Sequence, residues 1–200
     1  PSFLHAVDDV SLTIGAGECV GLVGESGCGK STLVRVLARL LDATEGTIGF
    51  DGEDLAAVPA ARFARHPRRR ELQVVFQDPT ESLNPRYRAA EYIAEPLRLL
   101  VGLRERAQIA ARVEEAAREV GLPAALLSRF PHQLSGGQKA RVNIARAVAV
   151  RPRLMILDEP TAALDVSVQA IVLDLLADLR RRHGLSYLFV SHDLNVVRLM

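Results

Sequence analysis

The sequence contains no tryptophan, few other aromatic residues and only two cysteines, Cys19 and Cys28. The two cysteines show neither the spacing of a zinc site nor a disulfide framework, which is compatible with a reducing cytosol. Neither sign of charge dominates, because the formal net charge is +1. A nearly neutral chain gives no general reason to expect nucleic acid as a partner, since nucleic acids favour basic surfaces.

Long apolar runs are missing as well. No run approaches the ~20 residues that a helix needs to cross a bilayer, and no signal peptide opens the chain. The chain starts at Pro1 without a methionine and ends at Met200 inside an expected helix, so we expect a fragment that is truncated at its C-terminus. A chain of 200 residues can bury one substantial core, which predicts a single domain over residues 1–200.

Short apolar runs alternate with longer helical patterns along the chain. The runs that indicate buried strands are residues 20–23, 72–76, 154–157 and 187–190, with a shorter strand at 46–50. Helices are expected at 31–41, at 136–150 and at 166–182, and two or three more within 89–127. Buried strands that alternate with helices predict an α/β protein with a mainly parallel sheet.

Residues 24–32 form the clearest motif and match Gly-x4-Gly-Lys-Ser/Thr in full. An apolar run precedes them and an amphipathic pattern follows, the context in which backbone N–H groups at a helix start bind phosphates. Lys30 would reach the β- and γ-phosphates and the Ser31 hydroxyl would bind Mg²⁺. We prefer this interpretation to an ordinary glycine-rich turn. The predicted ATP-binding residues are Gly24, Glu25, Ser26, Gly27, Cys28, Gly29, Lys30, Ser31 and Thr32.

Two acidic residues, Asp158 and Glu159, follow the apolar run at 154–157. An acid at the end of such a strand holds Mg²⁺ in phosphate-loop ATPases, and we assign that role to Asp158. Glu159 is then placed to polarise the attacking water as a general base. Two solvated acids that open a loop are the alternative, and the intact phosphate loop makes it the weaker one.

Leu134-Ser135-Gly136-Gly137-Gln138 is the third motif, and with the first two it resembles the ATP-binding subunits of ABC transporters. Further motifs of that family occur in the correct order. Gln77 matches the Q-loop, residues 163–165 match the D-loop, and His192 matches the switch histidine. The resemblance implies Mg²⁺ contacts from Ser31, Gln77 and Asp158, and catalytic roles for Glu159, His192 and Gln77.

Ser135 is expected to cap a helix whose first residues are glycines, and such a helix start is a second anion site. In the family this site serves the nucleotide of a partner subunit, so that ATP lies between two chains. The resemblance therefore implies a head-to-tail dimer with an identical or a different second ATP-binding subunit. It adds a second set of nucleotide-binding residues, which are Ser135, Gly136, Gly137 and Gln138.

Five segments are similar to one branch of the family, the dipeptide and oligopeptide importers, which also includes nickel and glutathione importers. They are residues 76–86, 93–97, 130–133, 165–169 and 187–194. The resemblance implies ATP hydrolysis that drives uptake of a peptide or similar solute at the cytoplasmic face of the membrane. Permease subunits would contact residues 77–88, and a solute-binding protein would take part indirectly.

The implied fold is an ABC ATPase domain of the P-loop NTPase class. Its core lobe would comprise residues 1–88 and 149–200, and a helical subdomain would comprise 89–148. An antiparallel edge layer would come from residues 4–14 and 46–50. The family stacks an aromatic ring on adenine, but Phe3 is the only aromatic residue before the first buried strand, and we leave it out of the site.

Two other classes of ATPase share such a head. DNA-repair ATPases carry a long coiled coil between the two glycine motifs, whereas only about 100 residues and no sustained heptads separate them here. Tandem ribosome-acting ATPases carry a second cassette. The basic segment 62–70 is open to two interpretations: a nucleic-acid patch, or a solvated helix face or one that contacts membrane lipids and subunits. We favour the second because no aromatic platform accompanies it.

Overall fold

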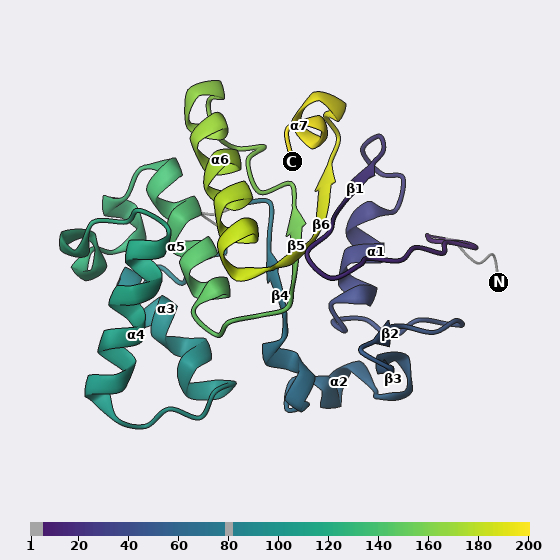
Figure 1. Ribbon diagram of the computed structural model, residues 1–200, viewed down its shortest axis with the longest axis horizontal. Coiled ribbons are helices and arrows are strands. Elements are labelled where there is room, and N and C mark those ends of the chain that lie inside the picture. The colour runs from purple at the N-terminus through teal and green to yellow at the C-terminus, as the bar shows by residue number, and fades with distance from the viewer. Residues whose placement is uncertain (1–5, 79–81) are drawn as a thin grey trace.

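The centre of the molecule is a parallel sheet of four strands (Figure 1). In this computed structural model, which describes residues 6–78 and 82–200, the strand order is β1-β6-β5-β4. The bounds are Cys19–Val23 for β1, Leu72–Val75 for β4, Leu154–Asp158 for β5 and Ser186–Ser191 for β6. All three pairings are parallel, which confirms the predicted fold class.

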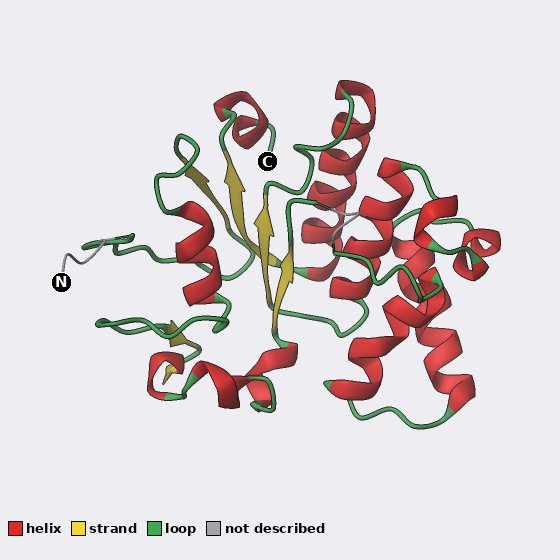
Figure 2. Ribbon diagram, turned by 180° about the vertical axis from the view of Figure 1, so that it is seen from behind, coloured by secondary structure: helices red, strands yellow, loops and turns green. Residues whose placement is uncertain are grey.

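Helices cover both faces of this sheet, because successive strand residues point to opposite sides. Met155, Leu157 and Phe189 pack in one core with α6 (Val166–His183). Ile156, Leu188 and Val190 pack in a second core with α1 (Lys30–Leu37). Figures 1 and 2 show these two helices on opposite sides of the strands. Each continuous apolar run in the sequence therefore supplies side chains alternately to the two faces of the sheet.

β1 differs from the buried strand that its apolar run predicts. Its residues are half-buried or exposed, and Val23 retains 39% of its accessible surface. Among the described strands, β1 pairs with β6 alone, so it forms an edge of the four-stranded sheet. An edge strand has one neighbour instead of two, and apolar composition alone does not distinguish the two positions.

Three helices lie together beyond β4, at the left of Figure 1. They are α3 (Ala89–Leu99), α4 (Arg106–Glu119) and α5 (Gly136–Val148). Two short 3₁₀ turns, Ala124–Ser128 and Pro131–Gln133, connect α4 to α5. The predicted helices at 89–127 and from residue 136 are thus confirmed. Their apolar faces share one continuous core with β4, β5 and α6.

The antiparallel layer is smaller than the sequence predicts. It is a hairpin of β2 (Gly49–Phe50) and β3 (Glu53–Asp54), joined by the expected turn at Asp51 and Gly52. The prediction that residues 4–14 form a strand of this layer is wrong for residues 6–14, which form no strand, while residues 4 and 5 lie outside the described part. Residues 6–14 lack a ladder partner among the described residues, and an extended segment becomes a strand only through such pairing.

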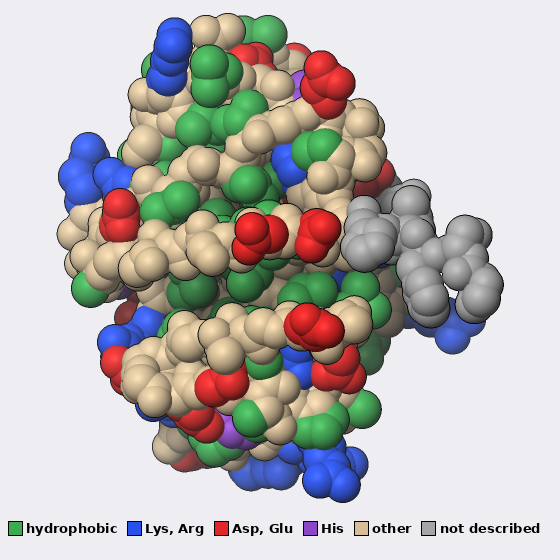
Figure 3. Space-filling view, turned by 90° about the vertical axis from the view of Figure 1, so that its right-hand side faces the viewer, with side chains coloured by type: hydrophobic (Ala, Val, Ile, Leu, Met, Phe, Trp, Pro, Cys, Tyr) green, Lys and Arg blue, Asp and Glu red, His purple; other side chains and the backbone are tan. Residues whose placement is uncertain are grey.

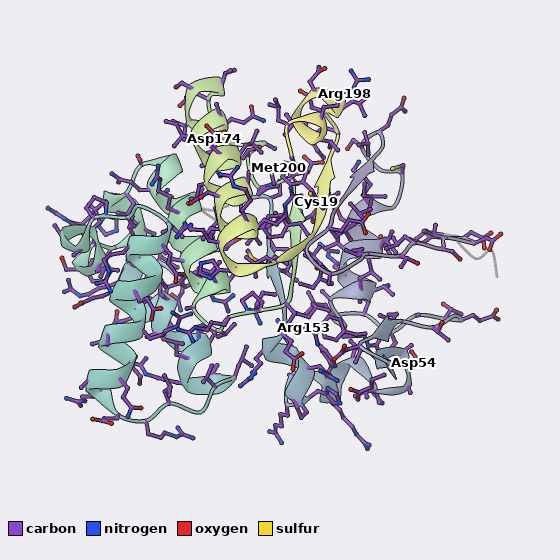
Figure 4. The ribbon with its side chains drawn as sticks, viewed as in Figure 1. Cys19, Asp54, Arg153, Asp174, Arg198 and Met200 are labelled. Carbon is purple, nitrogen blue, oxygen red and sulfur yellow. The ribbon has the colours of Figure 1, made fainter. Side chains whose placement is uncertain are left out.

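Ion pairs tie the hairpin to the base of the sheet. Arg153, which precedes β5, donates to the two Asp51 carboxylate oxygens at 2.6 and 3.3 Å. Arg68, in the turn Pro67–Arg70, pairs with Asp51, Glu53 and Glu71. Figure 4 labels Arg153 and, on β3, Asp54. Part of the basic segment 62–70 therefore serves contacts within the chain.

The face in Figure 3 shows apolar side chains at its surface in several places, and the exposed apolar residues of the chain include Val10, Leu12, Leu40 and Leu41. Val10 and Leu12 belong to the segment without a ladder partner, and Leu40 and Leu41 follow α1. Short helices α2 (Ala60–Phe63) and α7 (Leu194–Arg198) complete the fold. Among the described helices, none combines the length and apolar character that crossing a membrane requires.

Candidate nucleotide site

The loop at residues 24–29 connects β1 to α1 and depends on glycine at two points. Gly29 has φ of +100°, and a Cβ there would lie 2.2 Å from the carbonyl oxygen of Ala6. A Cβ at Gly24 would lie 2.7 Å from the Cys28 Sγ. Gly29 must therefore be glycine because of its backbone conformation, and neither Gly29 nor Gly24 has room for a Cβ. The loop ends where α1 begins at Lys30, so its N–H groups belong to a helix start.

Lys30 is buried, with 8% of its surface exposed, and its side chain turns back over the loop. The Nζ atom donates to the carbonyl oxygens of Gly24 at 2.6 Å and of Glu25 at 2.7 Å. An ammonium group at this point neutralises anionic ligand oxygens as well as closing the loop on itself.

Asp158 is the last residue of β5 and is also buried, at 7% exposure. Burial raises the pKa of its carboxyl group, and the adjacent charge of Glu159 raises that pKa further. Arg35 and Lys30 act in the opposite direction, because their positive charges favour the carboxylate. Asp158 is thus a buried acid that faces cations on α1.

Glu159 occupies a strained backbone conformation just beyond β5. Its φ is +48°, in the left-handed region that residues other than glycine seldom adopt. Its N–H donates to the carbonyl oxygen of Val190 on β6 at 2.9 Å, which extends the strand pairing by one step. Such strain persists only where the surrounding structure enforces it, and it is typical of functional sites.

Two side chains from neighbouring strand ends meet Glu159. Gln77, which follows β4, donates from Nε2 to the Glu159 Oε2 at 3.2 Å. His192, which follows β6, places Nδ1 2.9 Å from the same oxygen. An ionised carboxylate can only accept, so the His192 Nδ1 carries the proton in this arrangement. The three residues come from segments that are far apart in the sequence, and the parallel sheet brings them together.

A cavity of about 410 Å³ joins these groups. Most residues from 26 to 32 line it, together with Gln77, Glu159 and His192. The phosphate loop and the predicted catalytic residues therefore share one cavity. Ser135, Gly136, Gly137 and Gln138 do not line it.

Ser135 caps α5 as expected. Its Oγ accepts the N–H of Gln138 at 3.3 Å, and the Gln138 Oε1 accepts the N–H of Ser135 at 3.0 Å. This reciprocal pair is a capping box. Ser135 and Gly136 are exposed, so this helix start is accessible from outside the chain.

The donor set suits Mg²⁺. A hydroxyl from Ser31, a carboxylate from Asp158 and an amide oxygen from Gln77 are hard oxygen ligands of the kind that this ion prefers. Ser31 and Gln77 line the same cavity, and Asp158 precedes Glu159. The residues present therefore fit a magnesium–nucleotide complex better than a cluster of cysteine or histidine ligands.

The sequence did not predict two residues that contribute to the site. Arg35 lies on α1 and acts on Asp158 through its charge, but an arginine in an amphipathic helix gives no signal of its neighbour in space. Gln169 donates to the Oγ1 of the buried Thr161 at 3.1 Å and so links α6 to the loop after Glu159. Only the close spacing of Thr161 to the acidic pair could have suggested it.

Comparisons with known proteins agree with this geometry. The family model described as ABC transporter matches residues 7–162. A Brucella abortus (strain 2308) protein named as a peptide import ATP-binding protein is 52% identical over 98% of this chain and 58% of its own length. OppF of Salmonella typhimurium, named as an oligopeptide transport ATP-binding protein, is 47% identical over 99% of this chain and 59% of its own.

A solved structure resembles the chain over nearly its whole length. The ATP-binding cassette MJ0796, determined as a dimer in a post-hydrolysis state bound to ADP and Pi, superposes with a TM-score of 0.86 at 33% identity. The alignment covers 97% of this chain and 83% of that cassette. The chain therefore belongs to the ABC transporter family, and its fold is that of the family's ATP-binding cassettes.

Proposed function

We propose that this chain binds ATP with Mg²⁺, hydrolyses it, and thereby powers an ABC importer of dipeptides or oligopeptides. The observation that carries the proposal is the single cavity in which the phosphate loop meets Gln77, Glu159 and His192. The names of the curated relatives supply the peptide-import part. The chain spans 58–59% of those relatives, so importer function is an inference about a longer protein.

The roles of the residues follow from their positions. The N–H groups at the start of α1 and the Lys30 ammonium would hold the phosphates, and Ser31, Asp158 and Gln77 would hold Mg²⁺, which supplies charge neutralisation when bound. Glu159 would accept the proton of the attacking water. Because His192 and Gln77 both contact its Oε2, they would orient this carboxylate.

The site is complete only with a second chain in this proposal. The exposed start of α5 does not line the cavity of its own chain, so Ser135 and Gly136 would contact a nucleotide held by a partner. The dimeric state of the similar cassette supports that arrangement. The partner would be an identical or a different ATP-binding subunit.

Permease subunits are the expected membrane partners, and a solute-binding protein would deliver the peptide. We assign permease contact to residues 77–88, of which 79–81 lie outside the described part. In this proposal the chain would lie at the cytoplasmic face of the membrane. The grouping of α3, α4 and α5 supports the proposal that residues 89–148 form a helical subdomain beside a core lobe of 1–88 and 149–200.

Glu159→Gln tests the proposal, because the amide keeps the shape of the side chain and loses the base. We expect the variant to bind ATP with nearly unchanged affinity while Mg²⁺-dependent hydrolysis falls by about 10²–10⁴-fold. Fluorescent-nucleotide titration and phosphate release measure the two quantities. Glu53→Gln, a substitution away from the cavity, is the control and should hydrolyse ATP normally. Wild-type turnover in Glu159→Gln would remove Glu159 from the mechanism.

A further inference from the structure

The first turns of α5 and α6 press against each other at Gly137. A Cβ built on Gly137 would lie 2.6 Å from the Cγ1 of Val168, a distance that real Cβ atoms do not reach. Gly136, one residue earlier, would place a Cβ 3.4 Å from the Leu164 Cδ2, which is an ordinary contact. Gly137 is half-buried, and the two helices pack along the same core. The absence of a side chain at Gly137 therefore allows a close approach that Gly136 does not need.

Val168 cannot easily yield this space. It is β-branched and lies in the first turn of α6, where one χ1 rotamer is strongly preferred. Its backbone is also fixed, because its N–H donates to the Asp165 Oδ1 at 3.0 Å in the cap of α6. The next residue, Gln169, donates to Thr161, two positions after Glu159. The first turn of α6 thus contacts the start of α5 and the loop that follows Glu159.

We propose that the contact between Gly137 and Val168 positions the start of α5: only glycine at 137 lets this helix start lie so close to Val168, and hence to the Glu159 loop of the same chain. This inference rests on the proposed function, in which Ser135 and Gly136 meet a nucleotide held by another chain. Residue 137 would then have to be glycine because Val168 of the same chain leaves no room for a side chain. Any requirement of the partner-held nucleotide for glycine at this position would be additional. Widening the gap between α5 and α6 would displace Ser135 from the partner's site while leaving the phosphate loop of the same chain intact.

Compensating substitutions test the contact. Gly137→Ala alone should lower kcat by about tenfold or more with little change in KM for ATP, because the cavity of the same chain is unchanged. Val168→Ala removes Cγ1 and should by itself stay within about threefold of wild type. The double variant Gly137→Ala/Val168→Ala should recover to within about threefold of Val168→Ala. Gly136→Ala is the matched control, and Val168→Ala should not relieve any loss that it causes.

Thermal unfolding tests the contact between Gly137 and Val168 independently of the proposed function. Gly137→Ala should lower Tm in the wild-type background but raise it in the Val168→Ala background, since alanine favours helix over glycine once the clash is gone. A wild-type chain without ATPase activity would contradict the proposed function and leave this reversal intact. A double variant with the same Tm as Gly137→Ala would overturn the role of Val168. So would a double variant with the same low ATPase activity as Gly137→Ala, provided that the wild-type chain is active.

Discussion

The buried carboxyl group of Asp158 makes the stability of the folded chain depend on pH. Its carboxyl group is buried at the end of β5, and burial raises its pKa. The folded state therefore binds this proton more tightly than the unfolded state does. Stability consequently falls as pH rises through the interval between the unfolded and folded pKa values, and the cost is fully present above the folded pKa.

We predict that Asp158→Asn raises Tm at pH 7.5 in the absence of nucleotide and Mg²⁺. The neutral amide does not incur the cost of a buried charge, and ~1 kcal/mol of relief corresponds to about 2–4 °C for a chain of this size. The difference from wild type should shrink as pH falls through the Asp158 pKa. Addition of Mg²⁺ and ATP should stabilise wild type more than the variant, because only the carboxylate is a charged ligand.

Differential scanning fluorimetry from pH 4.5 to 8 measures both effects. Asp174→Asn is a suitable control, since Asp174 is exposed on α6 (Figure 4) and its charge is solvated. A lower Tm for Asp158→Asn at pH 7.5 would mean that Lys30 and Arg35 outweigh the effect of burial.

At the scale of single residues, the sequence predicts some features of the site and not others. The phosphate loop, Asp158 and Glu159 were predicted from residue type and spacing, whereas His192 was predicted only through the family resemblance. The strained φ of Glu159 and the turn of Lys30 toward Gly24 were not, because both depend on the backbone around them. The Val168 contact is not visible in the sequence either, since two half-buried first turns meet only in three dimensions.

Helices α4 and α5 cap each other with arginines. Arg141 on α5 donates from Nη1 to the carbonyl oxygens of Val120 and Gly121 at 2.7 and 2.9 Å, where α4 ends. Arg112 on α4 donates from Nε to the carbonyl oxygen of Ala149 at 2.8 Å, where α5 ends. A cation at the helix C-terminus satisfies unpaired carbonyl groups and complements the helix dipole.

We predict that Arg141→Met destabilises the protein by about 1–3 kcal/mol, because the apolar stem remains while two charge-assisted hydrogen bonds are lost. Chemical denaturation measures the change. Arg118→Met on the exposed face of α4 is the matched control, and its pair with Glu114 at 3.9 Å should contribute at most ~0.5 kcal/mol. Equal losses in the two variants would argue against the capping role of Arg141.

At the scale of elements, helices and parallel strands were predicted within a few residues, since the helices carry a regular apolar periodicity and the strands are short continuous apolar runs. The antiparallel layer was predicted less well. Val10, Leu12 and Ile14 alternate as in a strand, yet this segment has no partner in the described chain. Alternation reports which side chains are apolar, whereas a strand also requires a neighbour with free backbone groups.

At the scale of the whole molecule, the two halves of the proposed ATP site lie apart within one chain. The cavity with Lys30 lies at the carboxyl ends of the strands, while Ser135 begins a helix that does not line it. If each nucleotide lies between the Lys30 of one chain and the Ser135 of another, neither half suffices alone. Sequence reasoning predicted both halves, and it could predict their association only through the family resemblance, because no motif encodes a distance between chains.

Mixing two inactive variants tests this central claim most directly. Lys30→Ala removes the phosphate cation, and Ser135→Arg places a bulky cation at the start of α5, so each variant alone should lack ATPase activity. In a mixed dimer both defects fall in one composite site, and the other site keeps an intact Lys30 and an intact Ser135. We predict that mixed dimers recover ATPase activity or, if the two sites must work together, bind one ATP per dimer. Mixed dimers with neither activity nor a restored nucleotide site would contradict the account.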